Sequence, residues 1–234
     1  MKLNVFSVFI LSVSSLFIIS CDDSDDNTNG SETPNVKLTF KANANTGVKT
    51  TTAQSLIITE AFMGIKEMEV ERDTDDDSTE VEYEWEGPYK VNLLTGVSEP
   101  EMDLVNIEPG IYNEFEADVD NVLDENLSII VKAKFNDSDG IEYNVVFETE
   151  EEFELEIESE KGIEISEDVI NDLLLTIDLD ALFQNIDLSK AEVSEGNVIL
   201  INKDSNSELA KLIEEKIDDV TDFEEDTDED EDED

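Results

Sequence analysis

The chain has 234 residues, of which 64 are acidic and 14 are basic, and its formal net charge at neutral pH is −50. Such a charge repels phosphate backbones and anionic lipid surfaces and attracts cations, which argues against any nucleic-acid partner. The chain contains no histidine and one cysteine, which excludes imidazole bases and ligands, disulfide bonds within the chain and thiolate zinc sites.

The first 20 residues have the pattern of a bacterial export signal. A basic start at Lys2 precedes an apolar run from Val5 to Ile19, which is shorter than a membrane-spanning helix requires. The run ends in Ile18-Ile19-Ser20-Cys21, which resembles the lipobox of bacterial lipoproteins. The resemblance implies that residues 1–20 are a removed signal peptide and that Cys21 carries the lipid. The alternative is an ordinary secretory signal followed by an incidental cysteine.

Acidic and small polar residues follow the cysteine. The cluster resembles the export signal that directs lipoproteins of the Bacteroidetes to the outer leaflet of the outer membrane, and it consists of Asp22, Asp23, Ser24, Asp25 and Asp26. Residues 21–35 lack apolar periodicity, which predicts a flexible acidic tether. The expected location is therefore the outer membrane, with a lipid anchor and a domain at the cell surface. Without the resemblance, the cluster is only a solvated tether.

Alternating apolar and polar residues begin at residue 36 and predict short β-strands. The period of two breaks between Ile65 and Met68, beside Gly64, which predicts a β-bulge. Gly87-Pro88 is expected to separate two strands, and the segment 136–140 is expected to form a hairpin loop. The predicted strands lie at 36–42, 55–72, 81–85, 89–93, 111–119, 127–135, 141–147, 153–157, 173–179 and 198–201.

Two segments near the C-terminus have helical features. A short helix is expected at 180–186 with Asp180 as its cap. A longer one is expected at 205–220, where Ser205 and Glu208 match a capping box. Its predicted buried face consists of Leu209, Leu212, Ile213 and Ile217.

The order of these elements predicts a mainly β protein. Short strands separated by turn signals indicate an antiparallel β-sandwich of the immunoglobulin or transthyretin type over residues 36–220, with a short C-terminal helix. Residues 221–234 are almost all acidic and are predicted to form a disordered acidic tail.

Six segments of this domain share an order of features with known proteins. They are Ile65–Glu71, Val81–Tyr89, Val91–Gly96, Ile107–Tyr112, Asp178–Phe183 and the helix at 206–217. In this order they resemble Bacteroidetes surface lipoproteins of unknown function related to the domain-of-unknown-function family 4382. The resemblance implies a lipoprotein setting and a β-sandwich-like fold. It implies no activity and no catalytic residues.

One acidic loop is a candidate metal site. Calcium prefers oxygen ligands, and the loop offers the carboxylates of Asp73, Asp75, Asp76 and Asp77. The alternative is a solvated loop without a resident ion. The acidic segment ending at Gly140 does not fit an EF-hand, because Phe135 and Val146 stand where that loop needs an aspartate and a glutamate. No other cofactor is expected.

Three aromatic residues are the candidate ligand-binding residues. Trp85, Tyr83 and Tyr89 would form an aromatic platform for the sugar rings of an extracellular glycan. Alternatively, Tyr83 and Trp85 belong to the core, because they share parity with Val81 while glutamates occupy the opposite face.

Glutamates alternate with apolar residues at 80–86 and at 150–158. Like charges that face each other across a sheet cost roughly 0.2–1 kcal/mol per pair. The sequence therefore predicts that stability rises with ionic strength and with divalent cations.

The predicted role is a non-enzymatic binding or envelope-associated module, whose partner is an extracellular glycan or an envelope protein. Carboxylate pairs are uninformative among so many acids, so no enzyme activity is expected. The alternatives are a glycan-binding accessory protein of polysaccharide uptake and a calcium-stabilised adhesin. The oligomeric state stays open.

Overall fold

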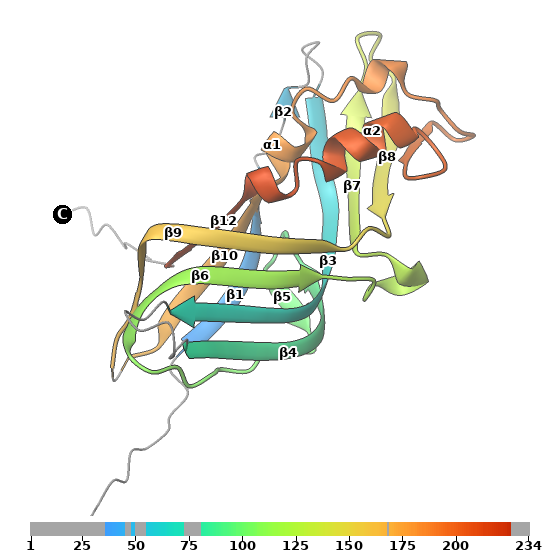
Figure 1. Ribbon diagram of the computed structural model, residues 1–234. Coiled ribbons are helices and arrows are strands. Elements are labelled where there is room, and N and C mark those ends of the chain that lie inside the picture. The colour runs from blue at the N-terminus through green and yellow to red at the C-terminus, as the bar shows by residue number, and fades with distance from the viewer. Residues whose placement is uncertain (1–35, 45–47, 50–54, 73–80, 168, 226–234) are drawn as a thin grey trace, which may run out of the picture. The chain divides into compact units, whose positions relative to one another are not determined.

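The structure of the chain is a computed structural model, and it describes residues 36–44, 48–49, 55–72, 81–167 and 169–225 (Figure 1). This part is mainly β, with two sheets and a few short helices, as the alternating patterns predict. Several predicted features lie outside the described residues. They are the signal peptide, Cys21, the export signal and tether at 22–35, the aspartates at 73–77 and the tail from residue 226 onwards.

The smaller sheet has three strands in the order β1–β10–β12. Strand β1 (Val36–Asn43) runs parallel to β10 (Asn171–Asp178), and β12 (Thr221–Glu225) pairs antiparallel with β10. The prediction that residues 221–225 belong to a disordered tail is therefore wrong. The segment pairs residue by residue with β10, so its backbone hydrogen bonds offset the unfavourable composition.

The larger sheet has nine strands, and its main path is β11–β8–β7–β3–β4–β5. Strand β2 also pairs with β3, and β6 pairs with both β3 and β9. The bounds are β2 Val48–Lys49, β3 Ser55–Arg72, β4 Val81–Asn92, β5 Val97–Glu99, β6 Gly110–Val119, β7 Ile129–Asn136, β8 Glu142–Thr149, β9 Phe153–Ile165 and β11 Val198–Ile201.

The expectation of a purely antiparallel arrangement is wrong at two places. Strands β1 and β10 are parallel, and so are β11 and β8. Both pairs join segments that are far apart in the sequence. Parallel neighbours need long crossover connections, and an alternating pattern within a strand carries no information about the direction of its partner.

Strand β3 holds the larger sheet together. One of its edges pairs first with β7 and then, beyond Gly64, with β6, while the other edge pairs with β4. Figure 1 shows β3 bending between these two halves. The register shifts between Ile65 and Glu67, so the predicted bulge is confirmed. Gly64 lies where the neighbours change, and a Cβ there would approach the Asp120 carbonyl oxygen to 2.7 Å.

The prediction that Gly87-Pro88 separates two strands is wrong. Strand β4 continues through both residues and pairs with β3 on either side of them. The pair lies opposite the bulge at Lys66, and a Cβ on Gly87 would approach the Lys66 carbonyl oxygen to 2.4 Å. Because the bulge already interrupts the ladder, the missing N–H of proline costs little there.

The short helix α1 (Leu179–Phe183) begins one residue earlier than expected and ends three residues earlier. Its cap is Asp178, whose carboxylate accepts a hydrogen bond from the Ala181 N–H at 2.8 Å. The prediction of Asp180 as the cap is therefore wrong. Within the described residues, three single-turn 3₁₀ helices complete the helical elements, namely η1 (Asp124–Asn126), η2 (Leu188–Lys190) and η3 (Asp218–Val220).

Helix α2 (Ser207–Glu214) is shorter than predicted and has no capping box. The residue before it, Asn206, has a left-handed φ of 49° and uses its side chain to donate to the Leu200 carbonyl at 2.7 Å. The prediction of a buried Leu212 is also wrong, because this side chain is 48% exposed. The buried face is instead centred on Ala210, Ile213 and Ile217.

One hydrophobic core includes residues of both sheets and of the helices. Phe40 of β1 meets Phe115 of β6 edge to face, with ring centroids 6.2 Å apart. Phe147 of β8 meets Phe183 of α1 in the same way at 6.2 Å. These ring contacts join β1 to β6 and β8 to α1 within the core.

Candidate functional site: an acidic sheet face and a polar cavity

Four neighbouring strands of the larger sheet, β4, β3, β6 and β9, present acidic residues at every second position. Residues directly opposite each other in a ladder point to the same side of a sheet. The carboxylates therefore form three rows of four, which we call the acidic sheet face. The rows are Glu86, Glu67, Asp118, Glu154; then Glu84, Glu69, Glu116, Glu156; and then Glu82, Glu71, Glu114, Glu158.

The opposite side of the same strands belongs to the core. Met68 and Val70 of β3, Trp85 of β4, Phe115 of β6 and Leu155 of β9 are all at most 2% exposed. The period of two along each strand thus separates apolar from acidic side chains. The ladders then align the four acidic sets into one surface.

A lysine lies at one margin of this surface. Lys66, the bulge residue of β3, places its ammonium 2.9 Å from the Asp118 carboxylate. Both side chains are about half exposed, so the pair contributes little stability in water.

The centre of the face shows the cost of packing like charges together. Burial raises the pKa of Glu69 to about 7, and repulsion from Glu82, Glu116 and Glu67 adds to this effect. Burial and repulsion from Glu154 also raise the pKa of Glu116. These carboxyl groups therefore hold protons at pH values where an isolated glutamate is ionised.

Two groups of carboxylates on the face converge closely. The ligand oxygens of Glu67, Glu69 and Glu84 lie within 4.8 Å of one another, and so do those of Glu69, Glu71 and Glu82. Calcium takes six to eight oxygens. Three carboxylates on an open sheet supply only part of such a shell, so the geometry suits a loosely held layer of cations better than a closed calcium cage.

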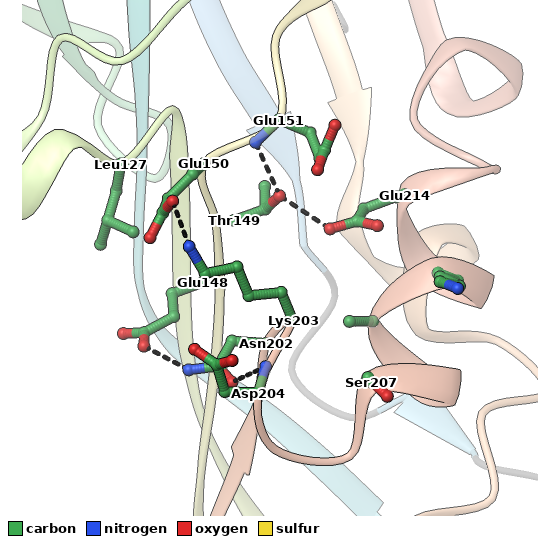
Figure 2. Close-up of a pocket in the computed structure, with 12 residues that line it drawn as sticks. Leu127, Glu148, Thr149, Glu150, Glu151, Asn202, Lys203, Asp204, Ser207 and Glu214 are labelled. Carbon is green, nitrogen blue, oxygen red and sulfur yellow. Dashed lines mark hydrogen bonds and ion pairs between the residues drawn. The ribbon is translucent and has the colours of Figure 1, made fainter.

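A second polar feature lies at the corner between β8 and β9 (Figure 2). A cavity of about 300 Å³ opens there, which we call the corner cavity. It is lined by Leu127, Glu148, Thr149, Glu150, Glu151, Asn202, Lys203, Asp204, Ser207, Ala210, Lys211 and Glu214. Leu127 precedes β7, and the other residues come from β8 and the segment after it, from the turn after β11 and from α2.

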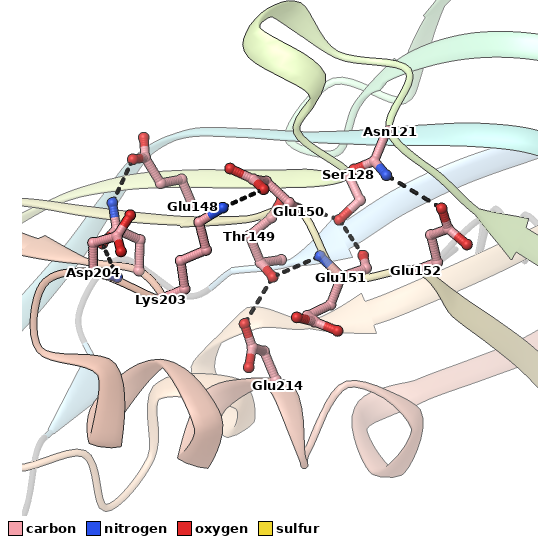
Figure 3. A network of polar contacts seen from close by, with 11 residues as sticks. Asn121, Ser128, Glu148, Thr149, Glu150, Glu151, Glu152, Lys203, Asp204 and Glu214 are labelled. Carbon is pink, nitrogen blue, oxygen red and sulfur yellow. Dashed lines mark hydrogen bonds and ion pairs between the residues drawn. The ribbon is translucent and has the colours of Figure 1, made fainter.

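Hydrogen bonds hold the corner in shape (Figure 3). The Thr149 hydroxyl donates to the Glu214 carboxylate at 2.7 Å and accepts from the Glu151 N–H at 3.1 Å. The Ser128 hydroxyl, which is fully buried, donates to the Glu151 carbonyl at 2.5 Å. Glu152 accepts from the Asn121 side chain at 3.3 Å.

A scan against protein-family models found no match, and neither did searches of curated proteins and of solved structures. The resemblance to family 4382 therefore stays a prediction. Among the described residues, no helix has the length and apolar character needed to cross a membrane.

The three aromatic candidate residues, Trp85, Tyr83 and Tyr89, do not form an exposed platform. Trp85 is 2% exposed and Tyr89 is 8% exposed, so neither offers a ring face to a sugar. Tyr83 is half-buried, and its hydroxyl accepts from the Glu108 N–H at 3.0 Å. This burial argues against the glycan platform and fits the alternative that the rings belong to the core, as their parity with Val81 indicates.

The acidic hairpin loop is a turn, as expected. The Asp137 carboxylate accepts from the N–H groups of Asp139 and Ile141 at 2.9 and 2.8 Å, and Gly140 has a φ of 79°. The hydrogen bond from the Ile141 N–H, with the others to this carboxylate, lowers the pKa of Asp137. Its oxygens thus stabilise the turn.

Neither the inner half of the acidic sheet face nor the corner cavity was predicted from the sequence. A signal for the former was present, since acids occupy every second position at 67–71 and at 114–118 as well as on the outer strands. No comparable signal marks the corner cavity, whose walls come from segments separated by more than 50 residues.

Proposed function

We propose that the chain is a non-enzymatic lipoprotein, anchored through Cys21 in the outer membrane and displayed at the cell surface. The acidic sheet face serves as its electrostatic contact surface for an envelope protein with a basic surface. The observation that carries this proposal is the alignment of twelve carboxylates on four adjacent strands.

The spacing of the carboxylates makes their charges act together. Neighbouring strands lie about 4.8 Å apart, and alternate residues along a strand lie about 7 Å apart. Both spacings are shorter than the screening length of about 8 Å at physiological ionic strength. A basic surface that docks there gains attraction and also relieves the repulsion that raises the pKa of Glu69.

We also propose a finer assignment of the fold. We take the two sheets to be a variant of an immunoglobulin-like or transthyretin-like β-sandwich, related to family 4382. The core shared by the two sheets supports this assignment. The two parallel strand pairs are where the chain departs from such a sandwich.

A calcium-stabilised adhesin is the second candidate. It is favoured by the two carboxylate groups centred on Glu69, whose oxygens converge within 4.8 Å. Calorimetry separates the candidates. One calcium ion bound per chain with micromolar affinity would support the adhesin, whereas weak uptake without saturation fits a loosely held cation layer. A glycan-binding accessory role has lost its main support, because Trp85 and Tyr89 are buried.

The location is tested by antibody labelling and protease accessibility on intact cells, with the natural chain and a Cys21→Ala variant. We expect intact cells to be labelled and the variant to be released or mislocalised. If the natural protein is shielded until the outer membrane is broken, the domain faces the periplasm. An envelope role would then replace the surface role.

The contact surface is tested with a defined basic probe, an oligolysine peptide, at about 150 mM salt, where long-range attraction is screened. One variant carries glutamine in place of Glu69, Glu84 and Glu116. The matched control carries glutamine in place of Glu101, Glu192 and Glu195, which are exposed and lie off the face. We expect the first variant to lose affinity and the control to retain it. An equal loss in both would show that only the net charge matters.

A further inference from the structure

We infer that the outer edge of strand β4, from Glu82 to Glu86, binds an extended segment of the partner protein as an added β-strand. The segment carries lysine or arginine at every second position. This inference rests on the proposed function, because it names the way in which a basic envelope protein engages the acidic sheet face. It adds backbone hydrogen bonds, which the charges of the face alone do not require.

Strand β4 has a partner along only one of its edges over this stretch. Its inner edge pairs with β3 on both sides of the bulge. On the outer edge, β5 pairs only with residues 90–92, beyond Pro88. Among the residues that the structure describes, no backbone hydrogen bond joins residues 82–87 to any segment except β3. The outer edge thus presents unpaired N–H and C=O groups of alternate residues over about 17 Å of extended chain.

The open edge is accessible from solvent. Three exposed side chains, which we call the edge glutamates, lie along it, namely Glu82, Glu84 and Glu86. Figure 1 shows β4 at the margin of this part of the larger sheet, with β3 on its inner side. The opposite margin of the acidic sheet face differs, because β12 lies against β9 there. The β4 edge is therefore the side from which a further strand can extend the face.

The edge glutamates select the chemistry of the added strand. Residues directly opposite each other in a ladder share one side of the sheet, so every second residue of an added strand faces an edge glutamate. Opposite charges in such pairs stabilise a sheet, whereas like charges destabilise it. On their inner side the edge glutamates face only other glutamates, those of β3. Lysine or arginine in the added strand therefore supplies the countercharge that these rows lack.

The intermediate positions of the added strand should be apolar. They lie on the same side of the sheet as Tyr83 and Trp85, which is the side that faces the core. Apolar β-branched residues also favour the extended conformation. A segment that alternates basic and β-branched residues thus matches both sides of β4.

The same charges exclude the chain itself as the occupant of this edge. Two copies joined through β4 would place glutamates opposite glutamates, and acidic edges prevent sheets from aggregating in this way. The segments 22–26 and 226–234 of the chain are acidic too. An open edge that repels acidic strands is selective for a partner of opposite charge.

The test is a titration of the complete chain, purified in detergent, at about 150 mM sodium chloride so that diffuse attraction is screened. The probe is a seven-residue peptide with blocked ends that alternates lysine and valine. Its control has the same composition, but its lysines are grouped together. Calorimetry should show one-to-one binding of the alternating peptide, at least about tenfold tighter than binding of the grouped isomer.

Backbone pairing is tested separately from charge. New strand hydrogen bonds should slow amide hydrogen exchange at least about tenfold at some residues within 82–86. Two further peptides keep every charge but carry methyl groups on the backbone nitrogens of either all lysines or all valines. Successive N–H groups of a strand point to opposite edges, so one methylated peptide should lose binding and the other should retain it.

Charge reversal tests the contribution of the side chains. One variant carries the substitutions Glu82→Lys, Glu84→Lys and Glu86→Lys. The matched control changes the net charge equally on β9, at the far side of the face, with Glu154→Lys, Glu156→Lys and Glu158→Lys. The β4 variant should lose the lysine peptide and bind an alternating glutamate–valine peptide instead. The β9 variant should keep the lysine peptide.

Three results would overturn the inference. They are equal affinity for the alternating and grouped peptides, equal loss of binding in the β4 and β9 variants, and unchanged amide exchange within 82–86 in the complex. The oligolysine experiment distinguishes these failures from failure of the proposed function. If oligolysine still binds the acidic sheet face, only strand addition is wrong. If it does not bind, the proposed contact surface is wrong as well.

Discussion

Replacing Glu69 by glutamine should stabilise the protein. Glu69 lies at the centre of the acidic sheet face, directly opposite Glu84 of β4 on one side and Glu116 of β6 on the other. Glutamine has nearly the same size and keeps the hydrogen-bonding capacity of the side chain. The substitution therefore removes one charge with little change in packing.

The magnitude follows from the two charges that repel Glu69 most, those of Glu82 and Glu116 on the neighbouring strands. Each like-charged pair across a sheet costs roughly 0.2–1 kcal/mol, so loss of both pairs should raise the free energy of unfolding by about 0.4–2 kcal/mol. For a domain of this size, that corresponds to a rise of roughly 1–8 °C in the melting temperature. The gain should shrink at high salt, because screening weakens the same repulsion in the natural protein.

The effect should depend on pH with a defined sign. The pKa of Glu69 is raised from 4.5 to about 7 in the folded protein. Between these values the folded state binds more protons than the unfolded state, so stability falls as the pH rises through this window. The destabilisation is complete above pH 7 and absent below about pH 4.5. The advantage of Glu69→Gln should therefore be largest at pH 8 and should vanish near pH 4.5.

Thermal unfolding monitored by circular dichroism at several pH values measures this effect. The control is Glu195→Gln, which makes the same change in net charge at an exposed loop position. If the two variants gain equal stability at pH 8, the repulsion is a property of the whole chain and the sheet face has no special role. A Glu69→Gln variant that is less stable than the natural protein would refute the reasoning altogether.

Three further changes test other features of the structure. In the natural protein, the melting temperature should rise when sodium chloride is increased from about 0.01 M to about 1 M, because the screening length falls from about 30 Å to about 3 Å. Millimolar divalent cations should raise the melting temperature further. A melting temperature that stays constant across the salt titration would contradict this prediction. Gly64→Ala should lower the free energy of unfolding by about 1–3 kcal/mol, measured from the urea midpoint, because the new Cβ would lie 2.7 Å from the Asp120 carbonyl oxygen. An unchanged midpoint would mean that β3 can shift at this position. Lys216→Met should cost about 1.5–3 kcal/mol in the same assay, since the Lys216 ammonium donates to the carbonyls of residues 181, 182 and 184 at the end of α1. The exposed control Lys211→Met should cost almost nothing, and equal losses would show that the contact to α1 is unimportant.

Local features of this fold were predictable because they depend on neighbouring residues in the chain. The direction of a side chain alternates along a strand whatever its partner is, so the alternation alone identified the strands and indicated that Trp85 faces the core. The interruption after Ile65 revealed the bulge, and the residues from Asp137 to Gly140 form the expected turn.

The choice of partners was decided only by the tertiary structure. Nothing within 36–43 or 171–178 indicates that these strands run parallel, and nothing in 221–225 indicates that an acidic segment becomes a strand. Helix α2 ends at Glu214, before the last apolar residues of the predicted helix, and the Lys216 ammonium beyond it donates to the Gln184 carbonyl after α1. Such contacts depend on residues brought together from distant parts of the chain.

The acidic sheet face and the corner cavity also show the difference between what local sequence patterns predict and what tertiary contacts decide. The sequence by itself determined that glutamates occupy one side of individual strands and that the chain attracts cations. Only the ladders joining β4, β3, β6 and β9 turned those separate sets into one surface, where mutual repulsion raises the pKa of Glu69. The corner cavity arises in the same way, because its walls come from β8, the turn after β11 and α2. Charge and alternation are local properties of a chain, whereas a surface or a cavity exists only when distant segments meet.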